Sequence, residues 1–285
     1  MKQMQTLRHR IRLYKNDLVS GYFHFRINTL ADPYTILGRA QPYKILFILS
    51  HMRSGSSLLT HLLNSNSEII GYGETHIQYD SEQDFKNLFL KVYLHSREFT
   101  KLEDLNKLQM NHKYVLDKVL HNNKFLTEDF LKSQQIYALF LLREPQRSLA
   151  SIMDLKPHWD EETAYHYYIK RLSSLVSYAQ LINSKKRSMF LTYEQLLNHT
   201  DSVFMALKQV LETRENFSEQ YEVLRTTGMP NVGDHKGNIK AGRIIRNQRK
   251  LENIISAELI DKARLHFDKC SETLSEYCST INNKL

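Results

Sequence analysis

A run of polar residues follows the first strongly apolar segment of the chain and has the composition of an anion-binding turn. The apolar segment is Tyr43–Ser50, and the sequence HMRSGSSLL comes directly after it. A turn between a strand and a helix directs several backbone N–H groups and the positive helix end at one point, which suits an anion. Gly55 would let the backbone approach closely, Ser56 and Ser57 add hydroxyl donors, and Arg53 adds a guanidinium fork. An ordinary helix N-cap containing two serines is the alternative interpretation.

This turn differs from the P-loop of nucleotide kinases. That motif, G-x-x-x-x-G-K-[ST], needs two glycines and a lysine, whereas here one glycine follows an arginine. No obvious acidic strand end that would bind Mg²⁺ accompanies the turn. We therefore expect an anion site without a metal, and a P-loop-type kinase acting on a nucleotide or small molecule is kept as an alternative.

A second polar segment follows the apolar run Ile136–Leu142 and has the sequence REPQRSLAS. Arg143 lies at the end of this expected strand, on the same sheet edge as Arg53. Ser151 comes eight residues later, about two turns into a helix that begins near Pro145. An arginine and a serine placed in this way could hold a second phosphate. The alternatives are a surface salt bridge for the arginine and a helix-surface hydroxyl for the serine.

Short apolar runs alternate with helical patterns along the chain, which predicts an α/β fold. We expect a P-loop-like three-layer arrangement, with a central, mostly parallel sheet flanked by helices and with ligands beyond the carboxyl ends of its strands. Residues 41–285 would form this domain and residues 1–40 an N-terminal extension. The expected strands are Tyr43–Ser50, Glu68–Tyr72, Tyr114–Leu120, Ile136–Leu142 and Ser188–Tyr193, and the expected helices cover 55–65, 81–96, 126–133, 146–154, 160–183, 201–212 and 248–265.

The composition indicates a globular protein with an anionic partner. Lysine and arginine number 39 against 31 acidic residues, which gives a formal net charge of +8 and favours a nucleotide, a nucleic acid, an acidic glycan or a membrane surface. Two cysteines, Cys270 and Cys278, are too few for a disulfide framework or a four-ligand zinc site. No run approaches the ~18 apolar residues that span a bilayer, so we expect a cytoplasmic location. The basic N-terminus is interpreted as a solvated helix face, with peripheral membrane contact as the alternative.

Taken together, the motifs R-S-G-S-S-L-L and R-x-P-x-x-S-x-x-S resemble those of sulfotransferases that use 3′-phosphoadenosine-5′-phosphosulfate (PAPS). The resemblance implies that the turn Arg53–Ser57, which includes Ser54, binds the 5′-phosphosulfate. It also implies that Arg143 and Ser151 bind the 3′-phosphate. Arg53 stands where cytosolic members of the family have lysine. An arginine at this position is similar to the carbohydrate and tyrosylprotein branches.

Two later segments are similar to further parts of this family. The sequence TYEQLL resembles a Y-E-x-L-L strand end, which implies that Tyr193 lies near the nucleotide. The sequence GDHKGNIKAGRI over 233–244 resembles a stretch that closes over the cofactor, which implies contacts from Lys236 and Arg243. For these two basic residues a solvated helix face is the alternative. The resemblance covers roughly residues 43 to 246.

Sulfonate transfer to an alcohol needs a base, cations around the leaving phosphate, and an in-line geometry. Glu74, in the sequence GYGETH, is the favoured base; it resembles a G-E-E-T-R segment of the tyrosylprotein branch, with one glutamate fewer and His76 in place of arginine. His121 is the rival base and His76 the third candidate. Lys118 could contact the bridging oxygen or the sulfonate. The alternative interpretation is a structural carboxylate for Glu74, a structural histidine for His121 and a solvated lysine for Lys118.

The expected activity is therefore transfer of a sulfonate group from PAPS to a hydroxyl acceptor. A sulfonate group carries less charge than a phosphoryl group, so positive side chains could replace the Mg²⁺ of kinases. The acceptor could be a carbohydrate, a lipid head group or a peptide tyrosine, selected by residues 75–112 and 155–185; a nucleic-acid partner is not expected. A non-catalytic anion-binding protein is the second alternative.

Overall fold

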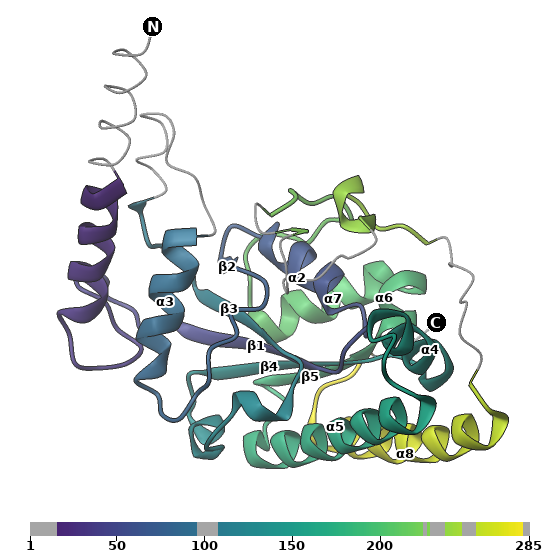
Figure 1. Cartoon of the computed structure of the whole chain (residues 1–285). Helices are drawn as coiled ribbons and strands as arrows, with labels where there is room; N and C mark the ends of the chain where they lie inside the picture. The colour runs from purple at the N-terminus through teal and green to yellow at the C-terminus, as the bar shows by residue number, and fades with distance from the viewer. Residues whose placement is uncertain (1–15, 96–107, 225–226, 229–236, 247–254, 282–285) are drawn as a thin grey trace, which may run out of the picture.

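A five-stranded parallel sheet forms the centre of the protein in the computed structural model (Figure 1). The structure describes residues 16–95, 108–224, 227–228, 237–246 and 255–281. The strand order is β2-β3-β1-β4-β5, so the first strand is central and its carboxyl end lies between those of β3 and β4. The strands are β1 (Lys44–Ser50), β2 (Ile69–Gly71), β3 (Tyr114–Val119), β4 (Ile136–Leu142) and β5 (Ser188–Thr192).

Both faces of the sheet are covered, which explains why its strands are almost continuously apolar. Along β1, Ile45, Phe47 and Leu49 pack into one apolar cluster, while Leu46 and Ile48 pack into the cluster on the opposite face. Helices α5 (Glu161–Ile182) and α8 (Ala257–Tyr277) cover the first face, and α2 (Ser56–Asn64) and α7 (Thr200–Leu211) cover the second (Figure 1). The predicted three-layer α/β architecture is confirmed.

The helices agree with the sequence pattern except at three places. The segment expected as a helix over 126–133 forms only a 3₁₀ turn, Asp129–Lys132. The last helix runs to Tyr277 because Cys270 and Leu274 continue its buried face; the beginning of its expected range, 248–254, lies outside the described residues. Tyr193 starts a helix instead of ending a strand. The remaining elements are α3 (Asp84–His95), α4 (Pro145–Leu155), α6 (Tyr193–Asn198), and the 3₁₀ turns Asn122–Lys124 and Asn238–Ala241.

The N-terminal part of the described chain packs against the domain. Phe23 and Ile27, on a helix over 16–28, are fully buried in the same cluster as α3 and the sheet, and Tyr34 and Ile36 follow them into it. The boundary between an extension and a domain at residues 40 and 41 stays a prediction. Of the helices among the described residues, none has the length and apolar character needed to cross a membrane.

A buried arginine joins the carboxyl ends of β1 and β3. The side chain of Arg171, from α5, has no solvent exposure. It donates hydrogen bonds to the backbone oxygens of Ser50 (2.7 Å) and Val119 (2.7 Å) and to Asn122 Oδ1 (2.8 Å). The planar guanidinium therefore satisfies carbonyl groups at the ends of two neighbouring strands.

We expect Arg171→Met to destabilise the protein by about 3 kcal/mol, because buried carbonyl groups left without a donor cost roughly 1–3 kcal/mol each. Urea unfolding would measure the change. Arg264→Met, at an exposed position of α8, is the matched control and should change the stability by less than about 0.5 kcal/mol. A similar, small effect for both variants would contradict the structural role of Arg171.

Candidate functional site

The turn between β1 and α2 has a backbone suited to bind an anion. Arg53 and Gly55 have left-handed φ angles of 64° and 93°, and Gly55 is the N-cap of α2 without a side-chain cap. The first N–H groups of the helix, from Ser56 and Ser57, have no intrahelical acceptor. The Ser54 hydroxyl is buried within the turn, 2.5 Å from Ser50 Oγ, so a ligand contact of Ser54 would come from its backbone.

The ring of Tyr193 packs directly on Gly55. A Cβ atom added to this glycine would lie 2.2 Å from Tyr193 Cδ2 and 2.5 Å from Cε2. The guanidinium of Arg143 lies over the same ring, 4.5 Å from its centroid. Tyr193 is held at this position because it begins α6, whose N-cap Thr192 forms a capping box with Gln195.

The two cationic motifs meet at this turn. Arg53 Nε donates to Ser151 Oγ (2.9 Å), and Arg143 Nη1 donates to the Arg53 carbonyl oxygen (3.1 Å). Among the described residues, buried Arg143 Nε has no hydrogen-bond partner, and burial lowers the pKa of this guanidinium. Three segments that lie far apart in the sequence therefore converge at one place. They contribute Arg53 and Gly55, Arg143 and Ser151, and Tyr193. Their ligand contacts stay predictions.

His51 is a residue of this turn that the sequence analysis missed. It is fully buried; its Nε2 accepts from the Arg143 backbone N–H (3.2 Å), and its Nδ1 lies 2.8 Å from the Met52 carbonyl oxygen. One acceptor and one donor nitrogen define a neutral tautomer. Burial also lowers the pKa of His51 to about 3. This imidazole fixes the start of the Arg143 segment against the turn.

Glu74 and Lys118 form a buried pair beside the turn. Glu74 Oε2 lies 3.6 Å from Lys118 Nζ, and Lys118 Nζ donates to Ser57 Oγ at 3.4 Å. Burial raises the pKa of Glu74, and the charge of Lys118 opposes that rise; burial also lowers the pKa of Lys118, which Glu74 opposes. Among the described residues, Glu74 Oε1 accepts no hydrogen bond. This buried oxygen faces His76 Nδ1 at 3.6 Å.

A second carboxylate, Asp117, holds this pair in place and was also missed. Asp117 is buried and accepts hydrogen bonds from the Thr75 backbone (3.0 Å) and hydroxyl (2.7 Å), the Tyr79 hydroxyl (2.7 Å) and the Lys118 backbone (2.8 Å). These bonds fix the residues that follow Glu74 and the backbone that carries Lys118. Burial raises the pKa of Asp117, and its hydrogen bonds oppose that rise.

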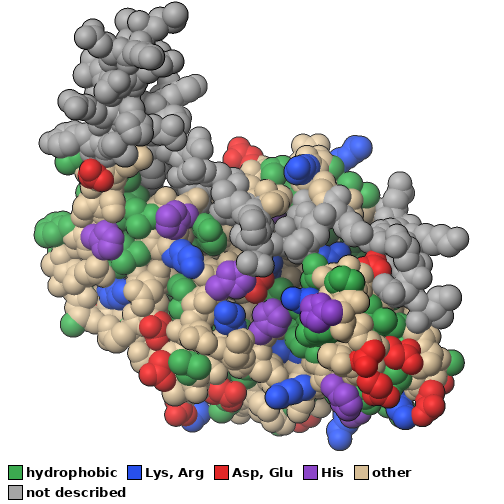
Figure 2. Space-filling model, in the orientation of Figure 1, with side chains coloured by type: hydrophobic (Ala, Val, Ile, Leu, Met, Phe, Trp, Pro, Cys, Tyr) green, Lys and Arg blue, Asp and Glu red, His purple; other side chains and the backbone are tan. Residues whose placement is uncertain are grey.

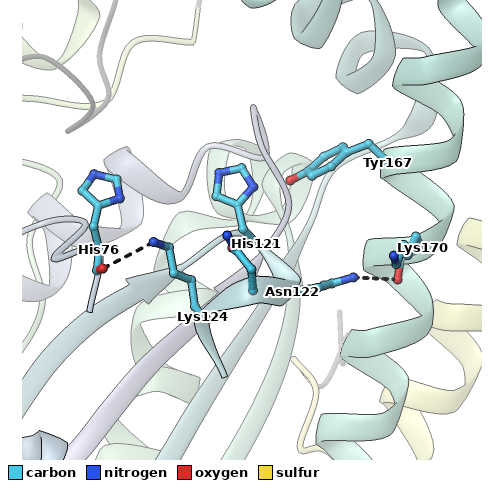
Figure 3. A pocket seen from close by; sticks show the side chains of 7 residues that line it. His76, His121, Asn122, Lys124, Tyr167 and Lys170 are labelled. Atoms are coloured by element: carbon cyan, nitrogen blue, oxygen red, sulfur yellow. Dashed lines mark hydrogen bonds between the residues drawn. The ribbon is translucent and has the colours of Figure 1, made fainter. Parts of the chain in front are cut away.

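The two candidate bases His76 and His121 both line a pocket of about 400 Å³ next to Glu74 (Figure 3). His76 Nδ1 lies 3.6 Å from Glu74 Oε1. The His121 ring lies 5.9 Å from that of Tyr167 between centroids, and burial lowers its pKa to about 4. Figure 2 shows histidine, lysine and arginine side chains gathered on the central part of this face of the molecule. Glu74 alone of the three candidates is both buried and paired with Lys118.

The late basic segment over 233–244 is described by the structure only from residue 237 onward. Lys236 lies outside the described residues. Arg243 lines a different pocket of about 620 Å³, together with Asn64 and Ser65 at the carboxyl end of α2. The turn between β1 and α2 is at the opposite end of that helix, so the described structure does not bring Arg243 into the cluster around Arg53. Its predicted nucleotide contact stays untested.

Comparison with solved structures supports the fold assignment. The sulfotransferase domain from the curacin biosynthetic pathway matches 80% of this chain and 98% of its own with a TM-score of 0.51 and 16% identity. Mouse sulfotransferase SULT7A1, complexed with PAP, matches 92% of this chain and 94% of its own with a TM-score of 0.41 and 12% identity. No family model and no curated protein sequence matches the chain. The chain thus has a sulfotransferase-like fold, as the motifs predicted.

We expect Gly55→Ala to destabilise the protein by about 2 kcal/mol, through left-handed backbone strain and a clash with Tyr193. Adding Tyr193→Ala removes the clash, so a double-mutant cycle by urea unfolding should show about 1 kcal/mol of coupling. Gly21→Ala is the control, since a Cβ there meets nothing within 4 Å. Additive effects of the two site substitutions would contradict the packing of Tyr193 on Gly55.

Proposed function

We propose that this chain is a sulfotransferase that moves a sulfonate group from PAPS to a hydroxyl acceptor, with Glu74 as the general base. The observation that carries the proposal is the convergence of two strand-end motifs beside a buried acid–lysine pair. Arg53 and Ser151 are directly hydrogen-bonded, and Lys118 contacts both Ser57 and Glu74. An anion site and a basic carboxylate therefore share one edge of the sheet.

The anion site fits the two charged ends of PAPS. We assign the 5′-phosphosulfate to the turn Arg53–Ser57, where helix N–H groups, hydroxyls and a guanidinium are available. We assign the 3′-phosphate to Arg143 and Ser151, because buried Arg143 Nε has no acceptor among the residues that the structure describes. A bound phosphate would supply that acceptor and offset the cost of burying the cation. Tyr193, between the two motifs, would contact the nucleoside.

The residues provide what the transfer step requires. The acceptor oxygen attacks sulfur; the new O–S bond forms as the bond between sulfur and the 5′-phosphate oxygen breaks, and 3′-phosphoadenosine-5′-phosphate (PAP) leaves. Glu74 takes the acceptor proton, and its raised pKa makes it a stronger base than an exposed carboxylate. Lys118 and Arg53 would stabilise the negative charge that develops on the leaving oxygen.

Two alternatives are less well supported. A P-loop-type kinase would have lysine after the second motif glycine, whereas Ser56 follows Gly55 here. A non-catalytic anion-binding protein would gain nothing from Glu74, because a buried carboxylate beside an anion site repels the ligand. The donor site is compatible with each of the three acceptor classes: a carbohydrate, a lipid head group and a peptide tyrosine.

PAP should raise the melting temperature of the protein, because it binds the folded state. We expect Arg143→Ala to weaken PAP binding by ten- to a hundredfold, equivalent to about 1.5–3 kcal/mol for charged hydrogen bonds. Calorimetric titration would give both affinities. Arg214→Ala is the control, since Arg214 is exposed and its backbone bonds to Glu68 before β2, at the opposite sheet edge. Stabilisation by ATP with Mg²⁺ and none by PAP would instead support the kinase alternative.

Glu74→Gln should lower the turnover number by roughly 10²- to 10⁴-fold and change PAP affinity by less than about twofold. The base acts when deprotonated, and burial raises its pKa above 4.5, so the wild-type rate should rise with pH through an acidic limb above that value. Lys118→Met should move this limb to higher pH, because it removes the charge that favours the carboxylate.

Rates measured from pH 4 to pH 9 would check both effects. His76→Gln and His121→Gln serve as comparison variants and should lower the turnover number far less than Glu74→Gln does. Loss of turnover in the His121 variant together with normal turnover of Glu74→Gln would remove Glu74 from the mechanism.

A further inference from the structure

The pocket that contains His76 and His121 opens beside the candidate base. Its wall comes from the segment after β2, the segment after β3, and α5 (Figure 3). His76 connects it to Glu74, with 3.6 Å between Nδ1 and Oε1. Tyr167 connects it to the anion-binding turn, since its hydroxyl accepts from the Met52 backbone N–H (2.9 Å) and donates to the Leu120 carbonyl (2.9 Å). A molecule in this pocket would contact His76 and Tyr167, which are the neighbours of Glu74 and of the turn.

The lining of the pocket is polar and positively charged. Its residues are His76, His121, Asn122, Asn123, Lys124, Tyr167 and Lys170. None of these seven is acidic or aliphatic, and the two lysines give the lining a charge of +2 when the histidines are neutral. Glu74, on the other side of His76, is already paired with Lys118. The positive charge at the mouth of the pocket is therefore not balanced within its lining.

The positive charges around the pocket also affect the pKa of His121. Burial is the largest cause that lowers its pKa to about 4, and the positive charges of Arg171, Lys124 and Lys156 add to the shift. A neutral imidazole can donate one hydrogen bond and accept another, which suits a hydroxyl group. The pocket thus combines neutral hydrogen-bonding groups with an excess of cations.

We propose that this pocket is the acceptor site and that its acceptor is a sugar that already carries an anionic group. The inference rests on the proposed function. The hydroxyl to be sulfated would lie near Glu74 Oε1, and the carboxylate, sulfate or phosphate of the sugar would lie near Lys124 and Lys170. A sugar ring fits a lining of amide, imidazole and phenol groups, whereas the side chain of a peptide tyrosine would require an apolar slot.

The test uses sugars that differ in one group. Methyl glucoside is the neutral acceptor, and methyl glucuronide, glucose 6-sulfate and glucose 6-phosphate are the anionic ones. Binding to the PAP complex would be measured by calorimetry, and transfer by formation of PAP from PAPS. We expect at least one anionic sugar to bind about tenfold or more tightly than methyl glucoside, and this preference should shrink at high salt.

Substitutions in the pocket then test which residues produce the preference for anionic sugars. Lys124→Gln with Lys170→Gln should weaken binding of the preferred anionic sugar by about tenfold or more, leave methyl glucoside within about twofold, and leave PAP affinity unchanged. The matched control is Lys262→Gln with Lys269→Gln, which also removes two positive charges, from exposed positions of α8. The three anionic sugars distinguish a carboxylate from a sulfate or phosphate requirement.

Three outcomes would overturn the inference: equal affinity for neutral and anionic sugars, an equal loss for both in the lysine double variant, or binding of an acidic tyrosine peptide with no binding by any of the sugars. Each could occur with PAP affinity intact, which would leave the proposed sulfotransferase activity standing. If the wild-type protein did not bind PAP, that result would instead refute the proposed function itself.

Discussion

The carboxyl ends of β1 and β3 are held together by the buried guanidinium of Arg171, and both halves of the candidate site depend on that junction. β1 leads into the turn with Arg53 and Gly55, while β3 carries Lys118 at its end. Tyr167 is placed one helical turn before Arg171 on α5 and makes a similar connection between the Met52 backbone and the end of β3. One face of a single helix therefore fixes the spacing between the turn that carries Arg53 and the pair formed by Glu74 and Lys118.

This junction allows several like charges to stay close together. Arg53, Arg143 and Lys118 lie around the same sheet edge, and Glu74 pairs with Lys118 at 3.6 Å. Within the described part of the chain, buried Arg143 Nε has no hydrogen-bond partner, and Arg53 has a left-handed backbone; both features are unfavourable for stability. Such features persist where the surrounding fold imposes them, and they are typical of sites that a ligand completes.

Sequence reasoning predicted the sheet and much of the cluster because parallel strands place their carboxyl ends at one edge. Arg53 and Arg143 each follow a strongly apolar run, so their meeting could be expected without coordinates. The helix start at Tyr193 was also readable, since Thr192 and Gln195 have the spacing of a capping box, but the apolar run before it favoured a longer strand.

Other site residues could not be found in this way. Arg171 bonds to a carbonyl group 121 positions away, and Asp117 lies within an apolar strand whose pattern gave no reason to single out its carboxylate. His51 precedes the motif and acts through its backbone partner at Arg143. Their roles depend on tertiary partners, which local pattern and residue type do not specify.

The position of Lys118 between Ser57 and Glu74 connects donor binding to the strength of the base. The lysine charge favours the ionised form of Glu74 and limits the rise of its pKa. An anionic donor at Ser57 would share that charge and add its own negative potential, so the proton affinity of Glu74 would increase further. Under the proposed function, binding of the donor therefore makes the carboxylate a stronger base.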